Sequence, residues 1–169
     1  ESGEQIVDLP SRDLVSAIPD ALKEFIEGQL YLNQNFSKPE ESEPFFKKST
    51  ELDPDCAECF NSLGYSQRLQ LNLGDAKENY KKALETSLKE KEFIIVFKNY
   101  INLGVLSKKE NKFKEALKFY EKASEYTFGD ESKLASVSNN LADIYQKENN
   151  HKNYHTKESR VFFCISGCV

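Results

Sequence analysis

Apolar residues recur at three- and four-residue spacing along most of the chain, from about residue 12 onward. This period places them on one face of a helix, so the pattern predicts a series of amphipathic helices. Alternation of the kind expected for strands is nearly absent. The apolar run at 93–97 is the only strand candidate, and its polar flanks favour the start of a buried helix instead. The pattern therefore predicts an all-α fold.

Small residues and aromatic residues repeat in register along this helical pattern. A first landmark, small in every copy, occurs at Gly28, Gly64, Gly104 and Ala142. An aromatic landmark follows at Phe46, Tyr80 and Tyr120, and it is flanked by the small pairs Ser42 and Ser49, Ala76 and Ala83, and Ala116 and Ala123. Small side chains allow two helices to approach closely, and the aromatic ring fills the space beside them. A single helix pair cannot bury its apolar face alone, so we expect the pairs to stack.

With these landmarks the chain resembles the tetratricopeptide repeat family over roughly residues 21–158. The resemblance implies a right-handed α-solenoid of antiparallel helix pairs, with three full repeats and a partial fourth whose second helix is degenerate. We expect an N-terminal arm at 1–18, the repeat domain at 19–160 and an apolar C-terminal tail at 161–169. The arm is expected to cap the first repeat or to occupy the groove between the helices, and the role of the tail stays open.

The second repeat departs from the family length. It lacks the closing proline and runs about six residues beyond the usual 34, through residues 86–96. Six helical residues add about 9 Å. We expect the additional residues either to project at one end of the solenoid or to lengthen the following helix.

Composition restricts the function. The 169 residues carry a net charge of −5, without the basic excess that nucleic-acid binding requires. No apolar run approaches the length of about 20 residues that spans a bilayer. Four cysteines are too few for a disulfide scaffold and fit a reducing compartment, so we predict a cytoplasmic location. The absence of Met leaves an exported mature form and a fragment of a longer chain as open alternatives.

Residues that would carry catalysis are missing. The chain has no P-loop, GxSxG, HExxH or GxGxxG motif, so we expect neither an enzyme nor a cofactor. His151 and His155 share a helix face, but apart from Cys164 and Cys168 no nearby residue could complete a metal site with them, and we expect none. Cys56 and Cys59 form a C-x-x-C sequence at a junction between repeats, where we expect them to pack as small residues rather than to act in redox chemistry.

The resemblance implies a binding site in the concave groove formed by the first helices of the repeats. The family's groove-facing positions fall here on Phe25, Ile26, Gln29, Ser62, Ile101, Val105 and Asp143 and, as the candidate binding residues, on Asn61, Tyr65, Arg68, Lys98, Asn102, Lys109, Asn139, Asn140 and Lys147. An Asn side chain donates to a peptide carbonyl and accepts from a peptide N–H, so a row of them would bind an extended backbone. The four cations of this set favour a partner with an acidic segment.

The predicted function is a non-catalytic protein-interaction module, a scaffold, adaptor or co-chaperone, that binds a peptide or helix of a partner in the groove. The carboxylate clamp of the family's chaperone-binding members is matched only at Lys98, so we do not expect binding to heat-shock chaperone tails. Two alternatives remain. One is an assembly subunit that self-associates through its arm or tail, and the other is the repeat portion of a larger enzyme or regulator. The oligomeric state stays undetermined.

Overall fold

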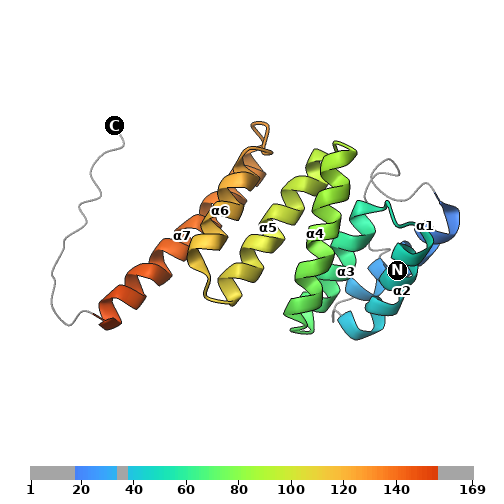
Figure 1. The fold of residues 1–169 in the computed structure, drawn as a ribbon, viewed down its shortest axis with the longest axis horizontal. Helices are drawn as coiled ribbons and strands as arrows, with labels where there is room; N and C mark the ends of the chain where they lie inside the picture. Colours follow the sequence, from blue (N-terminus) through green and yellow to red (C-terminus); the bar gives the residue numbers. More distant parts are fainter. Residues whose placement is uncertain (1–17, 34–37, 156–169) are drawn as a thin grey trace, which may run out of the picture.

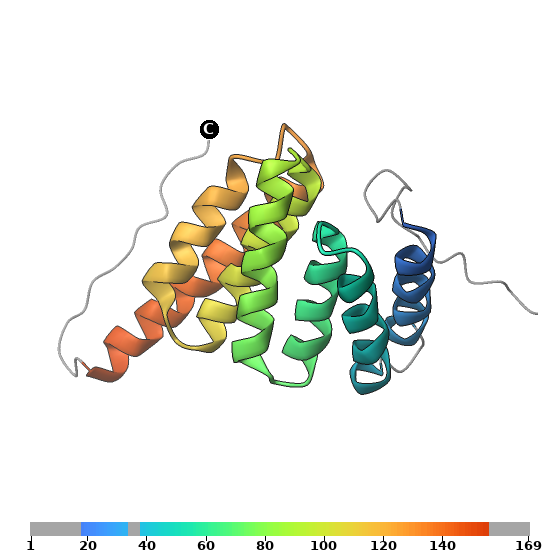
Figure 2. The same ribbon diagram turned by 45° about the vertical axis from the view of Figure 1, so that its right-hand side comes forward.

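The computed structural model describes residues 18–33 and 38–155, with side chains to residue 147. Within these residues there is no strand, and seven helices follow one another along the long axis of the molecule (Figures 1 and 2). They are α1 (Pro19–Leu32), α2 (Pro39–Leu52), α3 (Ala57–Leu69), α4 (Leu73–Lys89), α5 (Phe93–Lys109), α6 (Phe113–Ser124) and α7 (Glu131–His155). Each helix packs mainly on its neighbours in the sequence, and α3 also lies beside α5. The predicted all-α solenoid is confirmed.

The helix pairs are held together by the glycine and aromatic landmarks. A Cβ added to Gly28 would lie 2.8 Å from the ring of Phe46, and one added to Gly64 would lie 3.0 Å from the ring of Tyr80. The aromatic ring therefore takes the space that a side chain on the first helix would need. Three apolar clusters lie along the molecule, and each joins residues of two successive repeats or of the third repeat and α7.

Three of the turns between helices share one geometry. Leu71, Lys91 and Asn111, spaced by 20 residues, each follow the helix C-cap with a positive φ of 59–65°. The next backbone N–H donates to a carbonyl five residues back, as from Asn72 to Gln67 at 2.9 Å. This is the Schellman arrangement, which usually employs glycine because L side chains disfavour positive φ. Here three other residues adopt it.

The additional residues of the second repeat are shared between two helices. α4 and α5 have 17 residues each, against 14 in α2 and 12 in α6. The tight turn at Lys91 joins them, so no loop projects there. Of the two predicted outcomes, lengthening of the following helix is thus observed, together with a longer α4.

The fourth unit differs from a helix pair. α7 runs without a break for 25 residues, through the position where a turn to a second helix was expected. Its core face contributes Val137 and Ile144, whereas Leu134 and Tyr145 remain 43 % and 53 % exposed. Ala142, the counterpart of Gly104, is also exposed. The fourth unit is therefore a single helix in the described part of the chain. The arm as far as residue 17 and the tail at 161–169 lie outside it.

Candidate functional site: the groove along α1, α3 and α5

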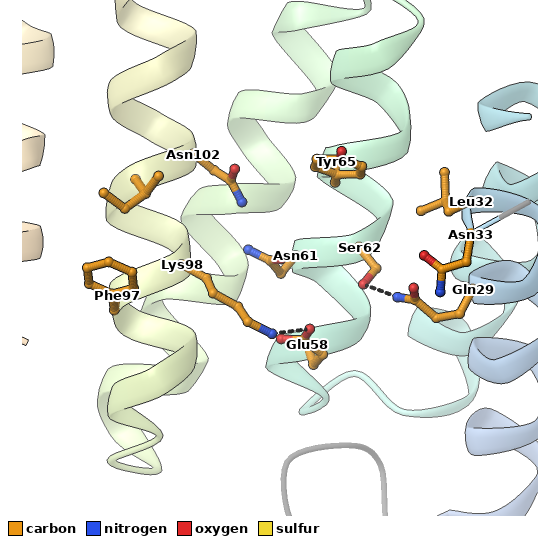
Figure 3. Close-up of a pocket in the computed structure, with 11 residues that line it drawn as sticks. Gln29, Leu32, Asn33, Glu58, Asn61, Ser62, Tyr65, Phe97, Lys98 and Asn102 are labelled. Atoms are coloured by element: carbon orange, nitrogen blue, oxygen red, sulfur yellow. Dashed lines mark hydrogen bonds and ion pairs between the residues drawn. The ribbon is translucent and has the colours of Figure 1, made fainter. Parts of the chain in front are cut away.

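A cavity of about 370 Å³ lies along the first helices of the three repeats (Figure 3). Its lining mixes polar and apolar side chains: Gln29, Leu32, Asn33, Glu58, Asn61, Ser62, Tyr65, Phe97, Lys98, Ile101 and Asn102. All of these come from α1, α3 and α5 or from the residue that follows α1. Four of the nine candidate binding residues therefore meet in one cavity, namely Asn61, Tyr65, Lys98 and Asn102.

An ion pair joins the two walls of the cavity at one end. Glu58 is the second residue of α3 and only 5 % exposed, and its Oε1 accepts a hydrogen bond from Lys98 Nζ of α5 at 2.8 Å. Burial raises the pKa of the Glu58 carboxyl above its usual value, and the Lys98 ammonium opposes this rise. The second carboxylate oxygen, Oε2, is buried without a hydrogen-bond donor among the described residues.

The four candidate asparagines lie in different surroundings. Asn61 Nδ2 donates to Asn99 Oδ1 at 2.8 Å, and both side chains are buried. The Asn61 amide nitrogen is therefore already engaged in a hydrogen bond within the protein. Asn102 is half-buried on the wall of the cavity. Asn140 donates to the Ser136 carbonyl oxygen of its own helix, and Asn139 is exposed on α7. Of these four asparagines, Asn61 and Asn102 line the cavity and the other two do not, so an Asn row over all four positions stays a prediction.

Other polar contacts shape the middle of the groove. Gln29 Nε2 donates to Ser62 Oγ at 3.0 Å and links α1 to α3. Tyr65 is 38 % exposed, and the guanidinium carbon of Arg68 lies 4.8 Å from its ring centroid. This is within the range of a cation–π contact, so Arg68 holds the Tyr65 ring in place.

Two of the four predicted cations are already paired with acids. Lys98 contacts Glu58, and Lys147 Nζ lies 3.6 Å from Asp143, which also accepts from Lys108 at 2.7 Å. Lys109 is exposed at the end of α5. The attraction of an acidic partner would therefore depend on Arg68 and Lys109, and it stays a prediction.

One groove position carried over by register is wrong. Phe25 is fully buried and packs with Phe46, Cys56 and Cys59 between the first two repeats. The bulky apolar side chain is drawn into the core, because burying it removes its surface from water. Four residues line the cavity but were missed: Leu32, Asn33, Glu58 and Phe97. Glu58 stands 40 residues before Lys98, at the same position of the preceding repeat, and this register was the available signal.

The C-x-x-C pair is buried at the junction between repeats, but it does not pack there as two free thiols. Cys56 and Cys59 are joined as a disulfide, and both are buried at the start of α3. Cys56 Sγ also accepts a hydrogen bond from the Cys59 backbone N–H, and so caps the helix. Among the residues described, no group of three potential ligands surrounds a metal position. The side chains of His151, His155, Cys164 and Cys168 lie outside the described part.

Comparison with known proteins gives this architecture a family. Residues 97–128, which include most of α5 and all of α6, match the model of the tetratricopeptide repeat. The chain contains a tetratricopeptide repeat. The repeat predicted from the sequence is thus confirmed over residues 97–128, where Gly104 and Tyr120 pack together. No curated protein matches the chain.

Solved tetratricopeptide structures have the same fold. The first such domain of Spaghetti (RPAP3), bound to an HSP90 peptide, matches with a TM-score of 0.65 at 20 % identity, over 77 % of this chain and 94 % of that one. The TPR2B domain of yeast Sti1, in complex with pHsp70, matches with a TM-score of 0.67 at 14 % identity, over 76 % of this chain and 98 % of that one. The Sgt2 TPR domain from Aspergillus fumigatus matches with a TM-score of 0.68 at 14 % identity, over 94 % of this chain and 97 % of that one.

In the described part of this chain, no helix is long and apolar enough to cross a membrane.

Proposed function

We propose that this protein is a protein-interaction module that binds an extended segment of a partner in the groove along α1, α3 and α5. The observation that carries the proposal is the lining of the cavity, in which amides and a hydroxyl alternate with Leu32, Phe97 and Ile101. Amides pair with peptide groups, and apolar side chains provide surface that a partner's side chains cover. Two structurally similar domains were solved with heat-shock protein partners, which supports a binding role for this kind of groove.

The groove does not reproduce the chaperone clamp. In this groove Lys98 forms an ion pair with Glu58, and the pair carries no net charge. A clamp for a carboxylate presents unpaired cations instead. We therefore propose a partner other than a heat-shock tail. An acidic segment would find its cations at Arg68 and Lys109, toward the C-terminal ends of α3 and α5. The proposed action is binding without catalysis. A cytoplasmic location stays a prediction, and the Cys56–Cys59 disulfide counts against it, because disulfides are rare in reducing compartments.

Affinity capture from native extract tests this proposal. The bait is the full chain, compared with a double variant, Tyr65→Ala with Asn102→Arg. Tyr65→Ala removes one contact surface of the groove and Asn102→Arg places a longer charged side chain in it, and neither residue is fully buried. Asn61 is a poor choice for substitution, because its loss would leave the buried Asn99 amide without its partner. The matched control is Glu121→Arg on the exposed face of α6. A partner that the double variant loses and the control keeps supports the groove, and a partner that both keep contradicts it.

Self-association is the second candidate, because α7 presents Leu134, Ala142 and Tyr145 to solvent on the face that a second helix covers in the other repeats. A second copy of the chain that packs on this face would bury these side chains. Sedimentation velocity over a range of concentrations tests it. A mass that doubles with concentration and returns to that of a monomer in Tyr145→Glu supports the assembly role. A constant monomer mass excludes it. The further alternative, a repeat portion of a larger enzyme or regulator, stays a prediction.

A further inference from the structure

The groove contains a buried carboxylate oxygen that lacks a partner. Glu58 Oε1 is bonded to Lys98, but Oε2 of the same carboxylate has no donor among the described residues, although the side chain is only 6 % exposed. Buried polar atoms are nearly always hydrogen-bonded, because leaving one unpaired costs its desolvation energy. In Figure 3 this carboxylate lies at the groove wall beside Lys98. The missing donor is therefore expected to come from whatever fills the groove.

A second acid makes this end of the groove negative. Glu92, the residue before α5, also has a buried carboxylate oxygen without a donor in the described part of the chain. Its pKa is raised, first by burial and then by the negative charges of Glu58 and Glu90. Glu58 and Glu92 thus repel each other, and Lys98 forms its ion pair with Glu58. The Lys98 side chain is 40 % exposed, so water screens its positive charge and weakens the compensation of Glu58.

We propose that the Glu58 end of the groove binds a basic side chain of the partner segment, with an arginine guanidinium as the best fit. This inference rests on the proposed function of the groove. The guanidinium N–H groups donate to Glu58 Oε2, and the positive charge relieves the repulsion between Glu58 and Glu92. Arginine fits best because it offers several N–H donors in one plane and loses less hydration energy on burial than an ammonium does.

The site also gives the bound segment a direction. Arg68 lies on α3 ten residues after Glu58, about 15 Å along the helix axis. An extended peptide covers that length in about four or five residues. A partner segment with a basic residue near Glu58 and an acidic residue four or five positions away, near Arg68, would match both ends of the groove. The reverse orientation would place like charges together at both ends.

Titration with a small cation tests this site directly. N-acetyl-arginine amide is added to the full 169-residue chain, and its neutral analogue N-acetyl-citrulline amide serves as the control ligand. The readout is the ¹³C shift of the Glu58 and Glu92 side-chain carboxyls. We expect a saturable shift with the arginine compound that weakens with added salt, and none with citrulline. In Glu58→Gln, where the shift is followed at the Glu92 carboxyl, the apparent affinity for the arginine compound should weaken about tenfold, because the charged acceptor is removed.

Two further variants keep the test decisive if Glu58→Gln alters the fold. Glu92→Gln removes the second charge without breaking the Lys98 ion pair, and should weaken the arginine compound about threefold. Glu121→Gln, on the exposed face of α6, should have no effect. Equal shifts with arginine and citrulline, or an arginine response unchanged in Glu92→Gln, would overturn the proposal. A positive titration together with a failed partner capture would leave the cation site standing and remove the proposed function.

Discussion

Gly104 of α5 lies so close to the ring of Tyr120 of α6 that a Cβ on Gly104 would overlap the ring. Tyr120 is fully buried, so its ring has no open space into which it can move. The same relationship joins Gly64 to Tyr80 and Gly28 to Phe46. This contact fixes how closely the two helices of each repeat approach, and so sets the shape of the groove.

A methyl group at Gly104 should therefore destabilise the protein. We expect Gly104→Ala to lower the free energy of unfolding by about 1–3 kcal/mol, because the ring or the helix must shift to admit it. Gly74→Ala is the matched control. Gly74 lies in the first turn of α4 with no atom within 4 Å of an added Cβ, so the better helix propensity of Ala should stabilise by up to about 1 kcal/mol. Urea unfolding followed by circular dichroism measures both, and equal effects would contradict the packing role of Gly104.

The hydroxyl of Tyr120 should be dispensable. It is buried without a hydrogen-bond partner among the described residues, and burial raises the pKa of this tyrosine well above its usual value. Tyr120→Phe keeps the ring against Gly104 and removes only the unpaired oxygen. We expect a gain of about 1 kcal/mol in the free energy of unfolding. A loss of that size would mean that the hydroxyl has a partner.

The turn at Lys91 offers a stabilising substitution. Lys91 is exposed and has a φ of 60°, which L side chains disfavour by about 1–2 kcal/mol and glycine adopts freely. Glycine also increases the freedom of the unfolded chain, which offsets part of the gain. Lys91→Gly should raise the thermal midpoint modestly, whereas Lys89→Gly in the last turn of α4 should lower it. A lower midpoint for Lys91→Gly would contradict the turn geometry.

Stability should depend on pH through Glu58. Its pKa is raised in the folded protein, chiefly by burial, above the usual 4.5. Just above pH 4.5 the folded chain thus holds a proton at Glu58 that the unfolded chain has released, and stability falls as the pH rises through this window. In Glu58→Gln this contribution disappears. Lys98 is left without its partner but is 40 % exposed, so water can solvate it.

Asp143 supplies a comparison of opposite sign. Its pKa is lowered, first by its hydrogen bond with Lys108, so its contribution is present at neutral pH and is lost as the pH falls through the folded-state pKa. Stability of the wild type, Glu58→Gln and Asp143→Asn is measured by urea unfolding at several values between about pH 2 and 7, because the Asp143 contribution is lost below its unfolded-state pKa of 3.8. The two variants should alter the pH profile in opposite directions, and a Glu58→Gln profile that matches the wild type would contradict the burial of Glu58 as a charged group.

The fold was predictable because its determinants are local and periodic. Gly64, Tyr80, Gly104 and Tyr120 recur in register, and each pair makes the contact that its spacing implies. The groove was less predictable, because its chemistry depends on which side chains meet across helices. Asn61 pairs with Asn99 and Lys98 with Glu58, 38 and 40 residues apart, and helical periodicity contains no information on such pairs. Phe25 shows that a residue at a groove-facing family position can be buried in the core instead, whereas Ile101 at the same position of the third repeat lines the cavity.

Binding in the groove is the central claim, and site-specific photo-cross-linking tests it most directly. The photoreactive residue p-benzoylphenylalanine replaces Tyr65, which lines the groove and is 38 % exposed, and in a second protein it replaces Glu121 on the exposed face of α6. Both are irradiated in native extract. The groove account predicts a partner adduct at position 65 that disappears when Asn102→Arg is added, and none at position 121. An adduct at position 121 with none at position 65 would contradict it.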